Sequence, residues 1–401
     1  MMDIVIVGAG QAAASMAAKL RVLGHDGAIT VIGEEPVPPY QRPPLSKAYL
    51  LGDMPLERLT LRGEDWWTEQ GIRLLTGTRA HSIDRDVKII HTDSGPLPYD
   101  QMALTLGASP RHLPARTGGD LEGVHAIRNL ADITRLAPEL VPGRSLVVIG
   151  GGYIGLEAAS VFQKLDLDVT LIEAAPRILG RVASAETATM IRNLHRAHGV
   201  RILEDTAISR LNGQSRVESI TLGNGDLIKT DLVILGIGVT PETTLAGTAG
   251  LKIDNGIACN ELGQTSDPAI WAAGDCASFP WQDSRLRLES VGNAIDMGEL
   301  VAENMLGAGK KYNPKPWFWS DQYDAKLQIA GWNAGYDHVI TRPGEGDHAG
   351  SVWYYANERL IAVDALNDAR AYMIGKRLIE GGKSPAPAKI ADPATILKEL
   401  L

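Results

Sequence analysis

The sequence predicts an α/β protein with two Rossmann-like dinucleotide-binding domains, each with a ββα/β-meander insertion, and a C-terminal α+β domain. Two observations predict this fold class. A strand, a glycine-rich turn and a helix follow one another twice, near residues 3–23 and again from residue 145. After Trp317, tryptophan-rich alternating runs such as SVWYYA and RLIAVDA are typical of an antiparallel sheet, and the run DARAYMIGKRLIEGG then predicts a helix.

The first strand–turn–helix unit opens with the β-branched run DIVIV at 3–7, and its helix extends to about Leu23. A second strand at 28–32 ends before Glu34 and Glu35. The turn carries the GxGxxA pattern, formed by Gly8, Gly10 and Ala13. This order predicts a βαβ unit.

The second unit repeats this order, with a strand at 145–149 and another at 168–173 that ends at Glu173. Its turn carries GxGxxG, formed by Gly150, Gly152 and Gly155, and Glu157 lies on the following helix. We expect a second dinucleotide-binding unit here.

The two halves also match beyond their glycine turns. QGIRLLTGTRAHSID and YDQMALTLGAS follow the first unit, and HGVRILEDTAISRL and TDLVILGIGVT follow the second. The matched positions are Gly71 with Gly199, Asp100 with Asp231, and Gly107 with Gly238. Asn212-Gly213 and Asn224-Gly225 are turn signals that favour hairpins in the second half. Each half therefore predicts βαβαβ, a short antiparallel meander and a return strand.

The glycine spacing has a physical meaning in this context. The first glycine permits a tight turn, the second lets backbone approach a pyrophosphate, and the third lets the helix pack on the sheet. Glu34 and Glu173 lie where a carboxylate accepts hydrogen bonds from ribose hydroxyls, and Glu173 would repel a 2′-phosphate, so we expect NAD rather than NADP. The nearby Arg177 and Arg181 weaken this preference. The alternative to dinucleotide binding is a purely structural glycine turn, and the presence of two matched units argues against it.

A third signal is the run TSDPAIWAAGD, which ends in Gly274-Asp275. Glycine allows close approach of backbone to a ligand, and the carboxylate of Asp275 can hold a polyol. A simple Gly-Asp turn explains the run equally well.

Composition narrows the function further. The chain has 401 residues and a formal net charge of −9, which argues against broad binding to nucleic acid or anionic membranes. No apolar run of about 18 residues and no basic leader are present, so we expect neither a membrane span nor secretion. The two cysteines, Cys259 and Cys276, exclude a disulfide framework. We therefore expect a cytoplasmic protein. Proline-rich stretches at Pro110–Gly119, around Pro241 and at Pro314–Pro316 predict the crossings between domains.

With these motifs the chain resembles the two-dinucleotide flavoproteins of glutathione-reductase type. It is most similar to the FAD-dependent, NADH-using ferredoxin reductases that serve bacterial cytochromes P450 and aromatic-ring dioxygenases. The strings that carry the resemblance are PYQRPPLSK at 39–47, GGGYIGLE at 150–157, WAAGDC at 271–276, ESVGNA at 289–294 and WFWSDQ at 317–322.

The resemblance implies a discontinuous FAD-binding domain at 1–109 and 241–316, an NAD-binding domain at 110–240 and a C-terminal domain at 317–401. It assigns to FAD the residues Gly8, Gly10, Ala12, Ala13, Glu34, Arg42, Lys47, Ala80, Arg128, Asp275 and Val291. It assigns to NAD the residues Gly150, Gly152, Ile154, Gly155, Glu173, Arg181 and Gly238. Lys47 beside the flavin, Glu157 near the nicotinamide and Trp319 on the partner-facing side are the expected catalytic residues.

Each catalytic assignment has a plainer alternative. Lys47 and Glu157 could be solvated helix residues, and Trp319 could be core of the third domain, although Trp317 is the better candidate for a plain core aromatic.

The missing cysteines indicate where the electrons go. Disulfide reductases of this type need a pair of thiols near the flavin, but no cysteine precedes Cys259, and Arg42 stands where thiol-based oxidases need a single cysteine. We expect Cys276 to be buried core. A flavin converts the two-electron hydride of NADH into single electrons, and the chain has no iron–sulfur motif, so we expect no metal site here and a 2Fe–2S ferredoxin as external acceptor.

A rubredoxin reductase, a diaphorase-like dehydrogenase and an NADH-sensing interaction protein stay open as alternatives. We expect a monomer or weak dimer.

Overall fold

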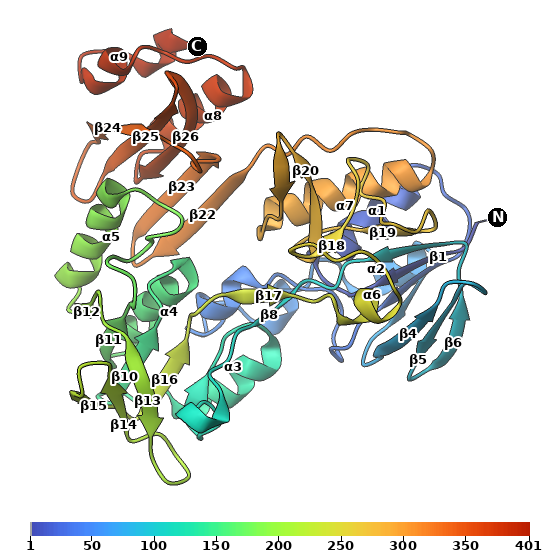
Figure 1. Ribbon diagram of the computed structural model, residues 1–401, viewed down its shortest axis with the longest axis horizontal. Helices are drawn as coiled ribbons and strands as arrows, with labels where there is room; N and C mark the ends of the chain where they lie inside the picture. The colour runs from blue at the N-terminus through green and yellow to red at the C-terminus, as the bar shows by residue number, and fades with distance from the viewer. Residues whose placement is uncertain (1) are drawn as a thin grey trace. The chain divides into compact units, whose positions relative to one another are not determined.

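A computed structural model describes residues 2–401. The chain forms two compact units (Figure 1). The first unit contains the residues up to Arg42 together with Pro55–Ser109 and Val239–Pro314. The second unit contains Pro43–Met54, Pro110–Gly238 and Lys315–Leu401. The proline-rich stretches predicted as crossings lie where the chain passes from one unit to the other.

A parallel five-stranded sheet organises the first unit, in the order β19-β7-β1-β2-β3. Its strands are β1 (Ile4–Val7), β2 (Ile29–Ile32), β3 (Ile72–Leu75), β7 (Gln101–Leu104) and β19 (Ile270–Ala272). An antiparallel meander follows β3, formed by β4 (Ala80–Asp84), β5 (Ile89–Thr92) and β6 (Gly95–Pro98). A smaller sheet contains β18 (Ile257–Ala258), β20 (Ala277–Trp281) and β21 (Ser284–Leu286).

The helices of the first unit are α1 (Gln11–Val22), α2 (Glu64–Glu69), α6 (Thr244–Thr248) and α7 (Val291–Met305), with a 3₁₀ turn at Leu56–Arg58. The alanine-rich sequence of α1 favours a helix and leaves little side-chain bulk. As a result α7 approaches closely, and a Cβ placed on Gly298 would lie 2.7 Å from the carbonyl oxygen of Ala12.

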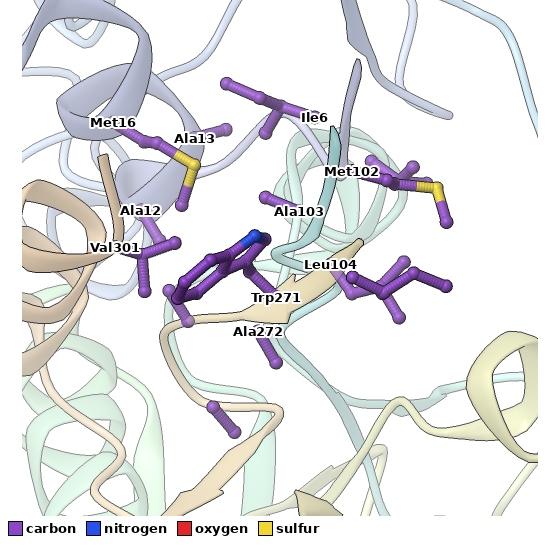
Figure 2. Close-up of a cluster of buried hydrophobic side chains, with 14 of the residues drawn as sticks. Ile6, Ala12, Ala13, Met16, Met102, Ala103, Leu104, Trp271, Ala272 and Val301 are labelled. Atoms are coloured by element: carbon purple, nitrogen blue, oxygen red, sulfur yellow. The ribbon is translucent and has the colours of Figure 1, made fainter. Parts of the chain in front are cut away.

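The core of the first unit lies between the parallel sheet and these helices. β-branched residues fill β1 and β2, whose side chains are almost all buried on both faces, as a parallel sheet requires. Figure 2 shows the Trp271 ring of β19 among smaller side chains from α1, β7 and α7, namely Ala12, Ala103 and Val301.

The second unit contains a parallel sheet of order β12-β11-β10-β16-β9. Its first four strands repeat the order β3-β2-β1-β7 of the first sheet, whereas its edge strand β9 precedes the other four in the chain. Its strands are β9 (Val124–His125), β10 (Ser145–Ile149), β11 (Asp168–Ile172), β12 (Arg201–Leu203) and β16 (Leu232–Leu235). Its meander contains β13 (Ile208–Asn212), β14 (Ser219–Leu222) and β15 (Leu227–Lys229), with hairpins at both Asn-Gly signals. The helices are α3 (Leu130–Leu136), α4 (Tyr153–Lys164) and α5 (Ala185–Ala197).

An antiparallel sheet of order β22-β23-β26-β25-β24 follows in the same unit. Its strands are β22 (Trp317–Gln322), β23 (Ala325–Gly331), β24 (His338–Pro343), β25 (Gly350–Ala356) and β26 (Arg359–Leu366). The helix α8 (Ala369–Glu380) packs on it, with Asp368 as its N-cap, and α9 (Pro387–Ala391) follows. Short 3₁₀ turns lie at Pro43–Ser46, Ala115–Thr117, Ala137–Glu139 and Leu397–Leu400, and the chain crosses between units in β8 (Ala108–Pro110) and β17 (Val239–Pro241).

The predicted fold class is confirmed: two Rossmann-like sheets with meanders and a C-terminal antiparallel sheet with a helix. The segment Pro43–Met54, which the resemblance assigns to the FAD-binding domain, packs with the second unit. Its Leu50 contacts the core around α4 and α5. Across residues 2–401, every helix is too short or too polar to cross a membrane.

Candidate functional site

The carboxyl ends of the first unit's parallel strands meet at one edge of its sheet. β1 ends before Gly8, β2 ends two residues before Glu34, and β19 ends three residues before Asp275. Three of the sequence-predicted site residues therefore lie along the edge where open parallel sheets bind ligands.

The first glycine turn has the form of a nucleotide cradle. Gly8 has φ +102, and a Cβ there would lie 2.3 Å from the carbonyl oxygen of Thr105, so the turn requires glycine. A Cβ on Gly10 would meet no protein atom within 4 Å, and Ala13 is fully buried against the sheet. The first turn of α1 holds no acidic side chain, so its N-terminal N–H groups can receive an anion. The space before α1 fits a diphosphate.

The acidic residues after β2 differ in their surroundings. The side chain of Glu34 is 70% exposed, 3.5 Å from the guanidinium of Arg79. Glu35, which the sequence reasoning passed over, accepts hydrogen bonds of 2.6 Å from the hydroxyl of Tyr40 and from Arg42. The sequence shows two adjacent acids, and nothing in their order tells which one orients Arg42.

The remaining first-unit residues gather around the close contact of α1 and α7. A Cβ placed on Gly274 would lie 3.2 Å from the Ala12 side chain, and Asp275 follows Gly274. Val291 begins α7, whose N-cap Ser290 accepts from the N–H of Asn293. Ala80 lies elsewhere, at the start of β4 in the meander.

The second glycine turn repeats this geometry in the second unit. Gly150 has φ +107 and a Cβ there would lie 2.4 Å from the carbonyl oxygen of Gly236, whereas a Cβ on Gly152 would meet nothing within 4 Å. Gly155 packs so closely that a Cβ would lie 2.1 Å from Gly150. The first turn of α4 holds no acid, and Ile154 is exposed there. This turn also fits a diphosphate.

Glu173 is held rigidly beside this turn. One carboxylate oxygen accepts from the N–H of Gly151 and the other from the N–H of Ala175, each at 2.7 Å. Arg181 is exposed and lies beside Gly238, where a Cβ would be 3.8 Å from its guanidinium.

Arg177, by contrast, donates to the carbonyl oxygens of Ile178, Ala183 and Ser184. Its hydrogen bonds thus fix the loop that follows β11.

A buried ion pair joins Lys47 to Glu157. The Lys47 ammonium lies 3.0 Å from the Glu157 carboxylate, and the two side chains are 17% and 8% exposed. The hydroxyl of Ser320 on β22 donates to the same carboxylate oxygen at 2.7 Å. Burial raises the pKa of Glu157, while Lys47 and then Ser320 lower it and Asp321 adds to the rise. Glu157 is therefore a buried acid, not an exposed helix residue.

The aromatic residues of β22 alternate between its two faces. Trp317 and Trp319 share one face and stack with centroids 5.4 Å apart and an interplanar angle of 20°. Phe318 takes the other face, 4.9 Å from the ring of Tyr153 on α4. Both tryptophans are half-buried, so their packing does not single out Trp317 as plain core.

The units divide the predicted site residues into two groups. The first unit holds Gly8, Gly10, Ala12, Ala13, Glu34, Arg42, Ala80, Asp275 and Val291. The second unit holds the NAD-assigned residues with Lys47, Glu157 and Trp319. It also holds Arg128, whose backbone N–H donates to Asp132 at the start of α3.

Both cysteines are free and buried in the first unit. Burial raises the pKa of Cys259 to about 12 and that of Cys276 to about 11. Neither thiol forms a reactive thiolate near neutral pH.

Two glycine cradles of this form on one chain define an oxidoreductase that binds two dinucleotides. The chain belongs to the pyridine nucleotide-disulphide oxidoreductase family, which it matches over residues 2–298, and residues 317–401 match the reductase C-terminal family. The predicted class of FAD- and pyridine-nucleotide-dependent oxidoreductase is confirmed.

Curated relatives cover almost the whole chain. A ferredoxin–NAD(P)(+) reductase of Sphingomonas sp is 40% identical over 100% of this chain and 97% of its own length. Rhodocoxin reductase of Rhodococcus erythropolis is 39% identical over 99% and 94%. Among solved structures, the covalent complex of putidaredoxin reductase with putidaredoxin matches with a TM-score of 0.95 and 38% identity, covering 100% of this chain and 98% of the reductase.

Proposed function

We propose that this protein passes electrons from NADH through FAD to a 2Fe–2S ferredoxin that serves a cytochrome P450 or a ring-hydroxylating dioxygenase. The observation that carries the proposal is the pairing of two glycine turns, each open in front of a helix N-terminus, with two deeply buried thiols. Without a reactive dithiol, the reducing equivalents must leave for an external acceptor. The relatives named for ferredoxin, rhodocoxin and putidaredoxin support this acceptor class.

The first unit holds FAD in this proposal. The turn from Gly8 to Ala13 and the N-terminus of α1 receive its diphosphate, Glu34 its ribose, and Asp275 its polyol chain. When bound, FAD supplies the conversion between a two-electron hydride and single electrons. Arg42, whose guanidinium is held by Glu35, belongs to the same FAD site in this proposal.

The second unit holds NADH. The turn from Gly150 to Gly155 receives the diphosphate, and the rigid carboxylate of Glu173 accepts from the adenosine ribose. Glu157 would lie near the nicotinamide, and the Lys47 ammonium would lie beside the flavin ring, where it would favour the negative charge that the flavin gains on reduction. Trp319 lies on the face of β22 that meets the ferredoxin.

We further propose the domain division 1–109 with 241–316, 110–240 and 317–401. Unit crossings near residues 109, 238 and 314 support it, with residues 43–54 packing outside their parent domain. A cytoplasmic monomer or weak dimer completes the proposal.

Acceptor profiling tests the proposal. NADH consumption is measured with 2Fe–2S ferredoxins, rubredoxin, oxygen and disulfides as acceptors, and we expect the highest kcat/KM with a ferredoxin. Rubredoxin is a specific competitor, because a rubredoxin–NAD(+) reductase of Pseudomonas putida is 36% identical over 91% of this chain. A preference for rubredoxin, oxygen or a disulfide over every ferredoxin would refute the proposal.

A further inference from the structure

A continuous chain of buried polar side chains leads away from Glu157. Ser320 and Gln322 occupy the same face of β22, and the Gln322 amide nitrogen lies 3.0 Å from the Ser320 hydroxyl. Beyond it, Nε2 of His195 on α5 lies 2.7 Å from the Gln322 amide oxygen. The hydroxyl of Tyr323 lies 3.2 Å from Nδ1 of His195. Apart from Tyr323, which is half-buried, these side chains are buried.

The chain of hydrogen bonds has a direction that Glu157 sets. An ionised carboxylate only accepts, so the single hydroxyl proton of Ser320 points to Glu157. The Ser320 oxygen must then accept from the amide N–H of Gln322, whose carbonyl oxygen in turn accepts from His195. This fixes the proton of neutral His195 on Nε2 and leaves Nδ1 to accept from Tyr323. Every donor thus points toward Glu157.

The charges around this chain are few. Lys47 faces Glu157 from the Pro43–Met54 segment, and Asp321 lies next along β22. At the far end, burial lowers the pKa of His195 to about 4, with His198 nearby adding to the decrease and Gln322 opposing it. Near neutral pH His195 is therefore an uncharged donor. Among the hydrogen-bonded side chains that run from Lys47 to Tyr323, Lys47 and Glu157 carry the charges.

We propose that Ser320, Gln322 and His195 are positioning residues that keep the buried Glu157 ionised and held against Lys47. This inference rests on the proposed function, because that function assigns Glu157 to the nicotinamide and Lys47 to the flavin. Through this chain, β22 of the C-terminal sheet and α5 of the NAD-binding fold control the charge of the pair. Hydrogen bonds to a charged acceptor are stronger than neutral ones, so loss of the first donor acts most strongly.

The test titrates Glu157 directly. Infrared spectra of the oxidised, FAD-loaded protein are recorded across pH, and the Glu157 carboxyl band is identified by subtracting spectra of Glu157→Gln. We expect Ser320→Ala to raise the pKa of Glu157 by about one unit, which is about a tenfold change in its protonation constant. Ser320→Thr keeps the hydroxyl and should restore the wild-type titration. Gln322→Met should shift the pKa in the same direction by less, because Ser320 then loses only its orienting donor.

Ser351→Ala is the matched control. Ser351 is an equally buried serine in the same sheet, and its hydroxyl accepts from the indole of Trp353 instead. It should leave the Glu157 titration unchanged. If Ser320→Ala and Gln322→Met both leave that titration at the wild-type pKa, the chain is core packing and the inference is wrong.

The pH profile of flavin reduction by NADH supplies a second readout, and its acidic limb should move with the infrared pKa. The infrared titration needs neither NADH nor ferredoxin. A shifted pKa together with failed acceptor profiling would therefore refute the proposed function while the positioning role stands. An unshifted pKa with successful profiling would refute only the positioning role.

Discussion

The carboxylate of Glu173 accepts a hydrogen bond of 2.7 Å from the N–H of Gly151, inside the second glycine turn. This contact places a fixed negative charge at the carboxyl edge of the sheet, where a 2′-phosphate of NADPH would have to lie. We expect kcat/KM with NADH to exceed that with NADPH at least about tenfold, equivalent to about 1.4 kcal/mol. Steady-state rates with a saturating artificial acceptor measure this ratio.

Two variants separate charge from structure at this position. Glu173→Gln keeps an oxygen that can accept from Gly151 but removes the charge, and it should narrow the ratio. Glu173→Arg should narrow it further by adding a partner for the phosphate. Equal wild-type efficiency with the two nucleotides would contradict the role given to Glu173.

The two cradles can be tested independently, because Gly10 and Gly152 each face open space. Their φ angles of −105° and −80° suit any residue, and a Cβ at either meets no protein atom within 4 Å. Gly10→Val should fold but lose FAD, because the side chain fills the diphosphate space. Gly152→Val should retain FAD, seen by its absorbance, yet resist reduction by NADH.

Gly63→Val is the matched control for both, since Gly63 also precedes a helix with φ −60° and open space around its Cβ. Gly63→Val should retain FAD and should still be reduced by NADH. The reverse pattern, with FAD lost from Gly152→Val and kept by Gly10→Val, would show that the cofactors are assigned to the wrong units.

The sequence predicts the repeated part of this fold well because local patterns encode it. The glycine turns, the β-branched strands and the Asn-Gly hairpins each depend on residues close together in the chain. The roles of adjacent acidic residues are harder to predict from the sequence. Glu34 and Glu35 are equivalent in the sequence, and only the fold shows that Tyr40 and Arg42 bind Glu35.

Contacts between distant segments are invisible at this level. Ser320 donates to Glu157 across 163 positions of sequence, and His195 meets Gln322 across 127. No periodicity or spacing links such residues. The sequence therefore predicted a role for Glu157 but none for Ser320, Gln322 and His195, which are hydrogen-bonded in series to it. The placement of Pro43–Met54 with the second unit is hidden for the same reason.

The two half-reactions should respond to different residues of the second unit. Lys47→Ala removes the ammonium beside Glu157 and should slow flavin reduction by NADH on the order of tenfold or more, because it removes charge stabilisation. Anaerobic stopped-flow absorbance measures that step. Lys47→Arg keeps the charge and should lose less.

Trp319→Ala should instead impair delivery to ferredoxin. A buried aromatic anchor contributes about 2 kcal/mol or more to association, so the KM for ferredoxin should rise at least about tenfold while ferricyanide reduction changes little. Trp317→Ala is the matched comparison, because Trp317 stacks on Trp319 from the same face. Equal loss of both half-reactions in Trp319→Ala would mark Trp319 as core packing.

A buried carboxyl on β26 should make the stability depend on pH. Asp364 is 1% exposed, and burial raises its pKa from 3.8 to about 6, against the hydrogen bonds from Tyr354 and Thr187. Within residues 2–401 its Oδ1 atom has no hydrogen-bond partner, and the same is true of the Tyr153 hydroxyl. Folding therefore favours the protonated form of the Asp364 carboxyl over its ionised form.

The sign follows from the direction of this shift. Between about pH 4 and pH 6 the unfolded chain releases the Asp364 proton while the folded chain retains it, so this group stabilises the fold in acid and the contribution falls as pH rises. A shift from 3.8 to about 6 corresponds to about 3 kcal/mol. Relative to wild type, Asp364→Asn should therefore gain unfolding free energy between pH 4 and pH 7 by up to that amount, measured by urea denaturation of the FAD-loaded protein. His195→Gln provides the comparison of opposite sign, because the lowered pKa of His195 gives a contribution that rises with pH from about 4 to 6.5. The unfolding free energy of His195→Gln relative to wild type should fall over that interval. If instead the unfolding free energies of wild type and Asp364→Asn change with pH in parallel, Asp364 titrates normally in the fold.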